Sequence, residues 1–199
     1  MAELLDVVNQ EDTVLSQALR SVVHQRGLWH RGVHVFLFEE AGKLLLQKRS
    51  AQRSAYPAVW DCSVSEHVKA GESYAEAAQR GMQEELGVSG VDIQALIKFK
   101  MNYGPDDNEI STLYRGVVDP ALVKFDPVEI EQVDWIRENQ LMEWASQEAG
   151  AFAGWFLQLL SWSRGNPSEV QVLETFSTDR LFPKASRPGA DAPVGHTPR

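Results

Sequence analysis

Residues 71–88 read GESYAEAAQRGMQEELGV, a segment with the features of one complete helix. Ser73 is a favoured N-cap residue, and Glu76 three positions later completes a capping box. Alanine, methionine and leucine supply helix formers and one apolar side. Gly87 has the usual place of a residue that ends a helix. The segment therefore predicts an amphipathic helix that begins after Ser73 and stops before Gly87.

The sequence around this helix alternates between strand and helix patterns. Apolar runs predict strands, over residues 33–38, 43–47, 61–65, 91–103, 109–119 and 128–136. Helical spacing predicts further helices, over residues 16–27, 137–149 and 151–163. Residues 4–8 and 14–15 flank a polar turn and predict a short hairpin. This mixture predicts an α/β (α+β) domain in which helices cover a mixed sheet.

The length of 199 residues suits one domain with extensions. We expect a hairpin and helix over 1–28, which lead into a domain over 29–165. Residues 166–199 are expected to form a largely disordered C-terminal tail, because 184–199 are rich in Pro, Gly, Ala and Ser without a period. The aromatic helix near the end of the domain is expected to cover the sheet. Monomer and homodimer both stay open.

Composition and charge exclude several partners. The chain has 28 acidic and 19 basic residues and a formal net charge of -9, which argues against nucleic acid. It shows no secretory signal and no apolar run of about 18 residues, so we expect a cytoplasmic protein without membrane contact. The single cysteine, Cys62, excludes an internal disulfide and is expected to be a small buried residue.

Two adjacent acids, Glu84 and Glu85, stand near the end of the helix, and Glu84 lies four residues after Arg80. Clustered carboxylates of this kind can hold a hard cation such as Mg²⁺. Acid-rich helices are more often simply solvated faces. The helix alone leaves these two interpretations open.

The longer segment from residue 66 to residue 88 resembles the Nudix box, G-x5-E-x7-R-E-U-x-E-E-x-G-U with U aliphatic. Glu72 takes the first acid, Arg80 takes the arginine, and Glu84 and Glu85 take the paired acids. The resemblance covers about residues 3–160 and implies the Nudix α/β/α sandwich. It also implies a Mg²⁺- or Mn²⁺-dependent hydrolase that cleaves a diphosphate linked to a nucleoside or other small organic group.

Two positions depart from this box. Glu66 stands where the box has its first glycine, and Gly81 stands where the box has the glutamate after the arginine. In the family's hydrolases that glutamate is a metal ligand and sometimes the base, and a glycine can serve as neither. Glu66 is then a candidate replacement ligand, because the backbone carbonyl at its position is a ligand in the family.

A second resemblance is more specific. Residues 56–72 are similar to the matching stretch of type I isopentenyl diphosphate isomerases, which belong to the same superfamily. This resemblance implies metal ligands, namely His67, His30, Asp107, Glu109 and Glu85. It implies that Arg49 and Arg53 bind diphosphate, with Lys48 beside them on the same strand. His24 is a further candidate metal ligand whose spacing is one residue off.

The isomerases' catalytic cysteine falls on Ser65, and a hydroxyl is a far weaker acid and nucleophile than a thiol. Cys62 lies three residues earlier, so on a short strand it is expected to face the opposite side from Ser65. His34 is expected to be a structural residue that points into the sheet. Ser65, which Cys62 is not placed to replace, therefore argues against the isomerase.

The sequence thus favours a hydrolase that acts on a small diphosphate. In that hypothesis Glu84 and Glu85 hold metal, and Glu109 completes the cluster or acts as base. Arg80 braces Glu72, while cations and one hydroxyl bind the substrate, namely Arg49, Arg53, Lys48 and Ser65. Two alternatives remain open: an isopentenyl diphosphate isomerase with Glu109 moving the proton, and a non-catalytic binding module with the Nudix fold.

Overall fold

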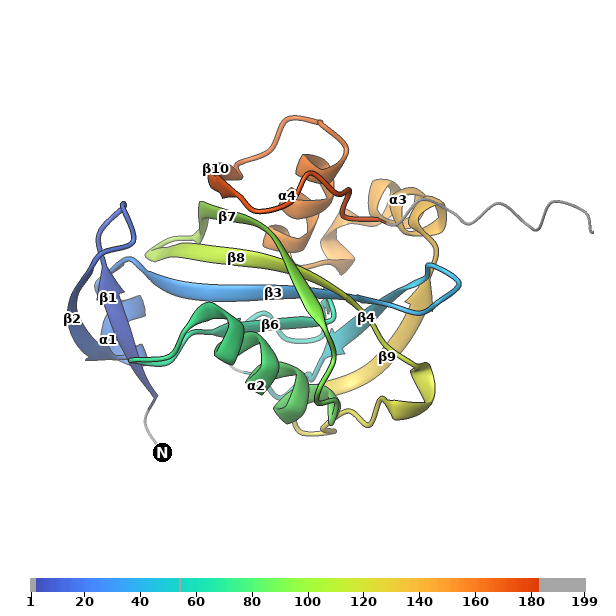
Figure 1. The fold of residues 1–199 in the computed structure, drawn as a ribbon, viewed down its shortest axis with the longest axis horizontal. Helices are drawn as coiled ribbons and strands as arrows, with labels where there is room; N and C mark the ends of the chain where they lie inside the picture. The colour runs from blue at the N-terminus through green and yellow to red at the C-terminus, as the bar shows by residue number, and fades with distance from the viewer. Residues whose placement is uncertain (1–2, 54, 183–199) are drawn as a thin grey trace, which may run out of the picture.

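The computed structural model describes residues 3–53 and 55–182. A mixed sheet runs through the middle of the molecule, with helices on both of its faces (Figure 1). Its strands are β3 (His30–Phe38), β4 (Leu44–Arg49), β5 (Trp60–Asp61), β6 (Val64–His67), β7 (Ile93–Gly104), β8 (Asp107–Val117), β9 (Ile130–Ile136) and β10 (Gln171–Thr175). The order is β10-β7-β8-β3-β4-β5, with β6 paired to β3 and β9 paired to β4. Only the β3–β8 pair is parallel among these described strands.

Each face of the sheet carries its own apolar core. Helix α2 (Tyr74–Leu86) packs Ala78, Met82 and Leu86 against β3 on one face. On the other face, α3 (Glu138–Gln147) and α4 (Gly154–Ser163) cover a larger core that includes Phe36 and Phe156. Because side chains alternate along β3, this one strand serves both cores. The predicted α/β/α arrangement with a mixed sheet is confirmed.

The ends of α2 follow the capping signals in the sequence. The Ser73 hydroxyl accepts from the backbone N–H of Glu76, and the Glu76 carboxylate accepts from the N–H of Ser73. Gly87 adopts φ 66°, a left-handed conformation that an L side chain would strain, and it ends the helix. The predicted helix is confirmed at both ends, so the position of every acid along it is fixed.

The N-terminal segment forms a separate two-stranded sheet beside the main one (Figure 1). It contains β1 (Leu4–Val8), β2 (Val14–Leu19) and the short helix α1 (Arg20–Gln25). The helix predicted over 16–27 therefore begins four residues late, because β2 keeps pairing with β1 as far as Leu19. No helix among the described residues has the length and apolar character that crossing a membrane demands.

The C-terminal segment differs from the expected disordered tail. Strand β10 extends the sheet by pairing with β7, and Leu181 and Phe182 are buried in the larger core. Two features explain why this segment is folded. Strand β10 pairs with the otherwise open edge of β7, and Leu181 and Phe182 cover apolar surface that would otherwise face water. Residues 184–199, whose composition predicted disorder, lie outside the described residues. Two short 3-10 helices, Pro120–Leu122 and Ala149–Ala151, complete the described elements.

Candidate active site

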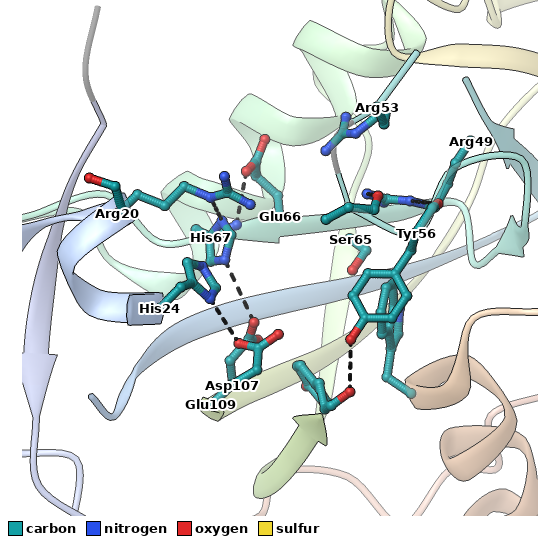
Figure 2. A pocket seen from close by; sticks show the side chains of 14 residues that line it. Arg20, His24, Arg49, Arg53, Tyr56, Ser65, Glu66, His67, Asp107 and Glu109 are labelled. Atoms are coloured by element: carbon teal, nitrogen blue, oxygen red, sulfur yellow. Dashed lines mark hydrogen bonds and ion pairs between the residues drawn. The ribbon is translucent and has the colours of Figure 1, made fainter. Parts of the chain in front are cut away.

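Three histidines and two acids from four elements meet where β3 and β8 begin; Figure 2 shows four of them, His24, His67, Asp107 and Glu109. His24 comes from α1, His30 begins β3, and His67 ends β6. Their ring centroids lie 4.9 to 5.2 Å apart. Asp107 and Glu109, at the start of β8, complete the group, which we call the histidine–acid cluster. The structure thus joins residues that lie up to 85 positions apart.

Strand register brings this cluster together. The parallel pairing of β3 with β8 places His30 opposite Glu109. The antiparallel pairing of β3 with β6 places His67 opposite Gly32, two residues further along β3. A Cβ atom at Gly32 would overlap Oε2 of Glu109, so only glycine lets that carboxylate lie against β3. Register and one glycine therefore determine the geometry of the cluster.

The atoms of the cluster fit a divalent metal ion. His24 Nδ1 lies 3.3 Å from Asp107 Oδ1, and Glu109 Oε1 lies 3.5 Å from His30 Nε2 and 3.7 Å from His67 Nε2. Three buried atoms of the group have no hydrogen-bond partner among the described residues: His24 Nε2, His30 Nε2 and Asp107 Oδ1. Buried polar atoms without partners are costly, and a bound cation would satisfy these. Imidazole and carboxylate donors together suit a first-row transition metal.

Electrostatics keeps the imidazoles available as ligands. Burial, together with the neighbouring His30, lowers the pKa of His67 well below its ordinary value, so its ring stays neutral. Burial by itself would lower the pKa of His30, but the nearby carboxylate of Glu109 outweighs burial and raises the pKa overall. A cation bound between these rings would replace the proton that Glu109 favours on His30.

The paired acids of the Nudix-like segment, Glu84 and Glu85, lie outside the histidine–acid cluster. Glu84 is half exposed on α2 and accepts from Arg80 at 3.1 Å. Glu85 is buried and accepts from Gln47 Nε2 at 2.8 Å; burial, with the charge of Glu66, raises its pKa to about 8. Among the described residues, neither acid belongs to a group of three ligands that could hold an ion. The described side chains bring Glu109 together with the histidines, and the metal role of Glu84 and Glu85 stays a prediction.

Glu66 and Gly81 are neighbours in space. A Cβ atom at Gly81 would lie 2.7 Å from Val64 Cγ1 and 3.4 Å from Glu66 Cβ, so strand β6 fills the room that a longer side chain would need. The Glu66 carboxylate accepts from the N–H of His67 at 2.8 Å and lies 3.4 Å from Arg80 Nη1. It therefore lies between the histidine–acid cluster and the arginine of the box.

Arg80 is the brace that the motif leads us to expect. Its Nε donates to Glu72 at 2.7 Å, and its Nη2 donates both to Glu72 and to the carbonyl of His67. These bonds attach α2 to the strand that carries His67. Arg80 lines neither of the two cavities described here, so its contacts give it a positioning role.

A cavity of about 330 Å³ opens beside the histidine–acid cluster (Figure 2). Arg49 and Arg53 line it, as does Ser65, whereas Lys48 does not. Lys48 instead pairs at 3.0 Å with Glu131 on the neighbouring strand β9, so this cavity gives no support to its expected role in substrate binding. A larger adjoining hollow is shared by the two arginines with Glu66, Glu84 and Glu85.

Several cavity residues were missed by sequence reasoning, namely Arg20, Tyr56, Tyr103 and Trp155. Tyr56 donates to the carbonyl of Tyr103 at 3.0 Å, and Arg49 lies over the Trp155 ring at 5.7 Å from its centroid. Trp155 appeared only as part of an apolar helix. Its indole N–H donates to the buried Asp61 at 2.9 Å, so a partner on a distant strand fixes its orientation. No local pattern could reveal that pairing.

The surroundings of Ser65 also differ from expectation. His34 Nδ1 lies 3.3 Å from Ser65 Oγ and 3.9 Å from Cys62 Sγ, so both side chains reach the same ring. The prediction that they face opposite sides is wrong, because β5 ends at Asp61 and β6 begins at Val64, and alternation does not hold across that break. The burial predicted for Cys62 is confirmed, and it raises the pKa of the thiol well above its ordinary value.

These features define a class: an α/β/α sandwich protein with a cluster of candidate metal ligands beside a cavity lined by arginines and acids. Comparison with known proteins agrees, because a NUDIX domain model matches residues 28–156, and the chain belongs to the Nudix family. Proteins of this family act in general on compounds that contain a pyrophosphate, and they generally use divalent metal ions.

The relatives of the chain include proteins named as isomerases and proteins named as uncharacterized Nudix hydrolases. It is 32% identical over 164 residues to an isopentenyl-diphosphate Delta-isomerase of Serratia proteamaculans, covering 80% of this chain and 90% of the relative. It is 34% identical over 167 residues to an uncharacterized Nudix hydrolase of Streptomyces coelicolor, with the same coverage. The crystal structure of DR0079 from Deinococcus radiodurans matches with a TM-score of 0.68 and 30% identity, over 80% of this chain and 98% of that one.

Proposed function

We propose that this protein is a divalent-metal-dependent hydrolase of a small organic diphosphate, with its metal at the histidine–acid cluster. The observation that carries the proposal is the set of unpartnered buried atoms on His24, His30 and Asp107 beside the cavity lined by Arg49 and Arg53. A bound metal ion at such a site supplies charge neutralisation and a lower pKa for coordinated water. The donor set favours Mn²⁺ over Mg²⁺, since Mg²⁺ prefers oxygen ligands.

The arginines of the cavity would bind the diphosphate. Arg49 is held by the carbonyls of Ala55 and Tyr56, at 3.2 and 3.0 Å, and is therefore preorganised. Arg53 lines the cavity and pairs with Glu129 of the adjoining hollow, a partner that it can exchange for an anionic ligand. Guanidinium groups match phosphate oxygens in fork geometry, which favours a small diphosphate as the ligand. The aromatic rings of Tyr56, Tyr103 and Trp155 leave an apolar wall for the organic group.

An isomerase is the second candidate, and one observation favours it. Ser65 and Glu109 both line the same cavity, so a ligand could meet a hydroxyl and a carboxylate at once. Allylic isomerisation of isopentenyl diphosphate needs one proton added and another removed. The weak acidity of a serine hydroxyl argues for hydrolysis over this reaction.

A panel of substrates separates these functions. The protein is incubated with Mn²⁺ or Mg²⁺ and with nucleoside diphosphates, sugar nucleotides and isopentenyl diphosphate. Release of inorganic phosphate or of a monophosphate supports the hydrolase, whereas an allylic product without release supports the isomerase. Binding without turnover of any compound would contradict both and indicate a binding module.

Matched variants locate the chemistry. Glu109→Gln removes a carboxylate of the histidine–acid cluster, and we expect it to lower kcat by at least about 100-fold. Glu143→Gln makes the same chemical change on the exposed surface of α3 and should leave turnover unchanged. Full activity of Glu109→Gln would contradict the assignment of the site.

A further inference from the structure

Two side chains of the cavity wall, Arg49 and Trp155, are connected behind that wall by one buried carboxylate. Trp155 Nε1 donates to Asp61 Oδ1 at 2.9 Å, and Asp61 Oδ2 lies 3.6 Å from Arg49 Nη1. The guanidinium carbon of Arg49 in turn lies 5.7 Å from the centroid of the Trp155 ring. Asp61 itself has no exposed surface and lines neither cavity described above. It can therefore influence a ligand only through these two neighbours.

Backbone contacts between three elements bring these side chains together. Strand β5, which ends at Asp61, pairs with β4, the strand that carries Arg49. The N–H of Ala153, the N-cap residue of α4, donates to the carbonyl of Trp60 at 2.8 Å, so α4 starts beside β5. Trp155 lies in the first turn of that helix. The main chain therefore sets the meeting of the arginine, the carboxylate and the indole.

Asp61 and Arg49 form a buried ion pair in which each charge depends on the other. Arg49 is 7% exposed, so its charge is largely removed from bulk water. Burial raises the pKa of the Asp61 carboxyl, whereas the positive charge of Arg49 opposes this shift. Asp61 Oδ2 has no hydrogen-bond partner among the described residues, and the ion pair of Asp61 among them is with Arg49. Loss of either partner would leave an uncompensated buried charge.

An anion in the cavity and Asp61 compete for the same guanidinium. Two of the five N–H groups of Arg49 are donated to the carbonyls of Ala55 and Tyr56. Nη1 donates to neither carbonyl and is the nitrogen that lies near Asp61. Because a carboxylate at this distance offsets part of the arginine's charge, it lowers the affinity that Arg49 by itself would give an anion.

We propose that Asp61 is a positioning residue, which holds Arg49 and Trp155 in place and limits how strongly the cavity binds a phosphate group by itself. A bare phosphate meets an arginine whose charge is already offset, whereas an organic diphosphate also gains contact with the Trp155 ring. The roles of Arg49 and Trp155 toward the substrate rest on the proposed function. The ion pair and its effect on anions do not.

The variant Asp61→Asn separates the charge of this residue from its hydrogen bonds. The amide oxygen can still accept from Trp155 and from the N–H of Cys62, which lies 2.8 Å from Asp61 Oδ1, but the charge that offsets Arg49 is lost. We therefore expect inorganic pyrophosphate, titrated by calorimetry in the presence of a metal chelator, to bind at least about fivefold more tightly. Asp134→Asn is the matched control, since Asp134 also accepts from the next backbone N–H, at 2.7 Å, but is exposed. It should leave the affinity unchanged.

The gain in affinity is expected to depend on Arg49. The double variant Asp61→Asn with Arg49→Gln should bind pyrophosphate no more tightly than Arg49→Gln alone. Equal or weaker binding by folded Asp61→Asn than by the original protein, including no binding by either, would overturn the inference. A gain that persists in the double variant would overturn it as well. A residue that only supports the fold would not tighten binding when it is replaced.

The inference remains testable if Asp61→Asn does not fold by itself. We then expect pyrophosphate or the second change Arg49→Gln to restore its circular dichroism spectrum, because each removes the uncompensated buried charge. Failure of both to restore the fold would overturn the pairing.

The indole N–H resonance of Trp155, assigned by its loss in Trp155→Phe, tests the contact with the second neighbour. Replacing a carboxylate acceptor by an amide weakens a hydrogen bond, so the resonance should shift in Asp61→Asn and not in Asp134→Asn. An unchanged resonance in Asp61→Asn would overturn the role toward Trp155. Tighter pyrophosphate binding in a protein that turns over no diphosphate would refute the proposed function and leave the role of Asp61 intact.

Discussion

Gly32 shows how much one residue can control in this site. Its missing side chain makes room for Oε2 of Glu109, and no other residue type fits there without moving that carboxylate. Glu109 in turn approaches His30 and His67 through Oε1 and accepts from Ser111 through Oε2. The absence of a side chain at one position of β3 therefore decides where this carboxylate lies.

We predict that Gly32→Ala weakens Mn²⁺ binding by about tenfold or more, because the displaced carboxylate can no longer face the histidines. Titration of Mn²⁺ followed by electron paramagnetic resonance measures the change. Gly150→Ala is the control, since a Cβ there meets nothing within 4 Å. Unchanged Mn²⁺ affinity in Gly32→Ala would refute this role of glycine.

Glu85 gives a prediction about pH. Its pKa is about 8 in the folded protein, raised by burial and by Glu66, and near 4.3 in an unfolded chain. The folded state therefore binds more protons between these values, so the free energy of unfolding falls as pH rises through that window. In the presence of a metal chelator, Glu85→Gln should remove this pH dependence. At pH 8 the free energy of unfolding of the variant should exceed that of the original protein by at least about 1.4 kcal/mol. Parallel stability curves for the two proteins across pH 5 to 8 would contradict the burial argument.

At the scale of elements, the sequence predicts best where the signals are local. The ends of α2 follow from Ser73, Glu76 and Gly87, and each is confirmed. The start of α1 was missed because pairing of β2 with β1, a contact between strands, overrides helix propensity. The shared approach of Ser65 and Cys62 to one histidine was missed for the same kind of reason, a break between two short strands.

The residues of the site were predictable in part. His30, His67, Asp107 and Glu109 came from resemblance, and strand register explains why they meet. No sequence motif marks His34, because the two side chains that contact its ring nitrogens, Tyr103 and Ser65, are 69 and 31 positions away along the chain. Such partners become visible only in the folded structure.

One acid makes several of the contacts between the N-terminal hairpin and the rest of the molecule. Asp12 accepts from Arg31 at 2.6 Å, from Lys98 at 2.7 Å and from the Tyr74 hydroxyl at 3.1 Å. These bonds attach the hairpin to the main sheet and to α2. The hairpin leads into α1, the helix that carries His24.

We predict that Asp12→Ala lowers the free energy of unfolding by about 2 kcal/mol and also weakens Mn²⁺ binding. Urea denaturation and metal titration measure the two effects. Glu11→Ala, at the exposed neighbouring position, should change neither. Full stability in Asp12→Ala would show that the hairpin is held by other contacts.

For the whole molecule, the net negative charge can be assigned to one part of the chain. Four of the 28 acids and four of the 19 bases follow Gly165, so the surplus of nine acids belongs to residues 1–165. Part of it gathers at Asp107 and Glu109, where the proposed divalent cation would offset it. The charge disfavours a polyanion in bulk, while Arg49 and Arg53 bring positive charge to the cavity where we propose that a small diphosphate binds.

The C-terminal segment that packs back against the sheet is expected to contribute to the stability of the whole molecule. Leu181 is 2% exposed in the larger core, so Leu181→Ala should lower the free energy of unfolding by about 3 kcal/mol. Leu173→Ala, on the exposed strand β10, should cost less than about 1 kcal/mol. Equal effects of the two changes, measured by thermal denaturation, would mean that the segment does not seal the core.

The central claim is that the metal lies at the histidine–acid cluster and not at the box acids. Anomalous diffraction from crystals soaked in Mn²⁺ tests it most directly. We predict a strong peak enclosed by His24, His30 and His67 together with Asp107 and Glu109. A peak found only beside Glu84 and Glu85, with the histidines unoccupied, would contradict the claim.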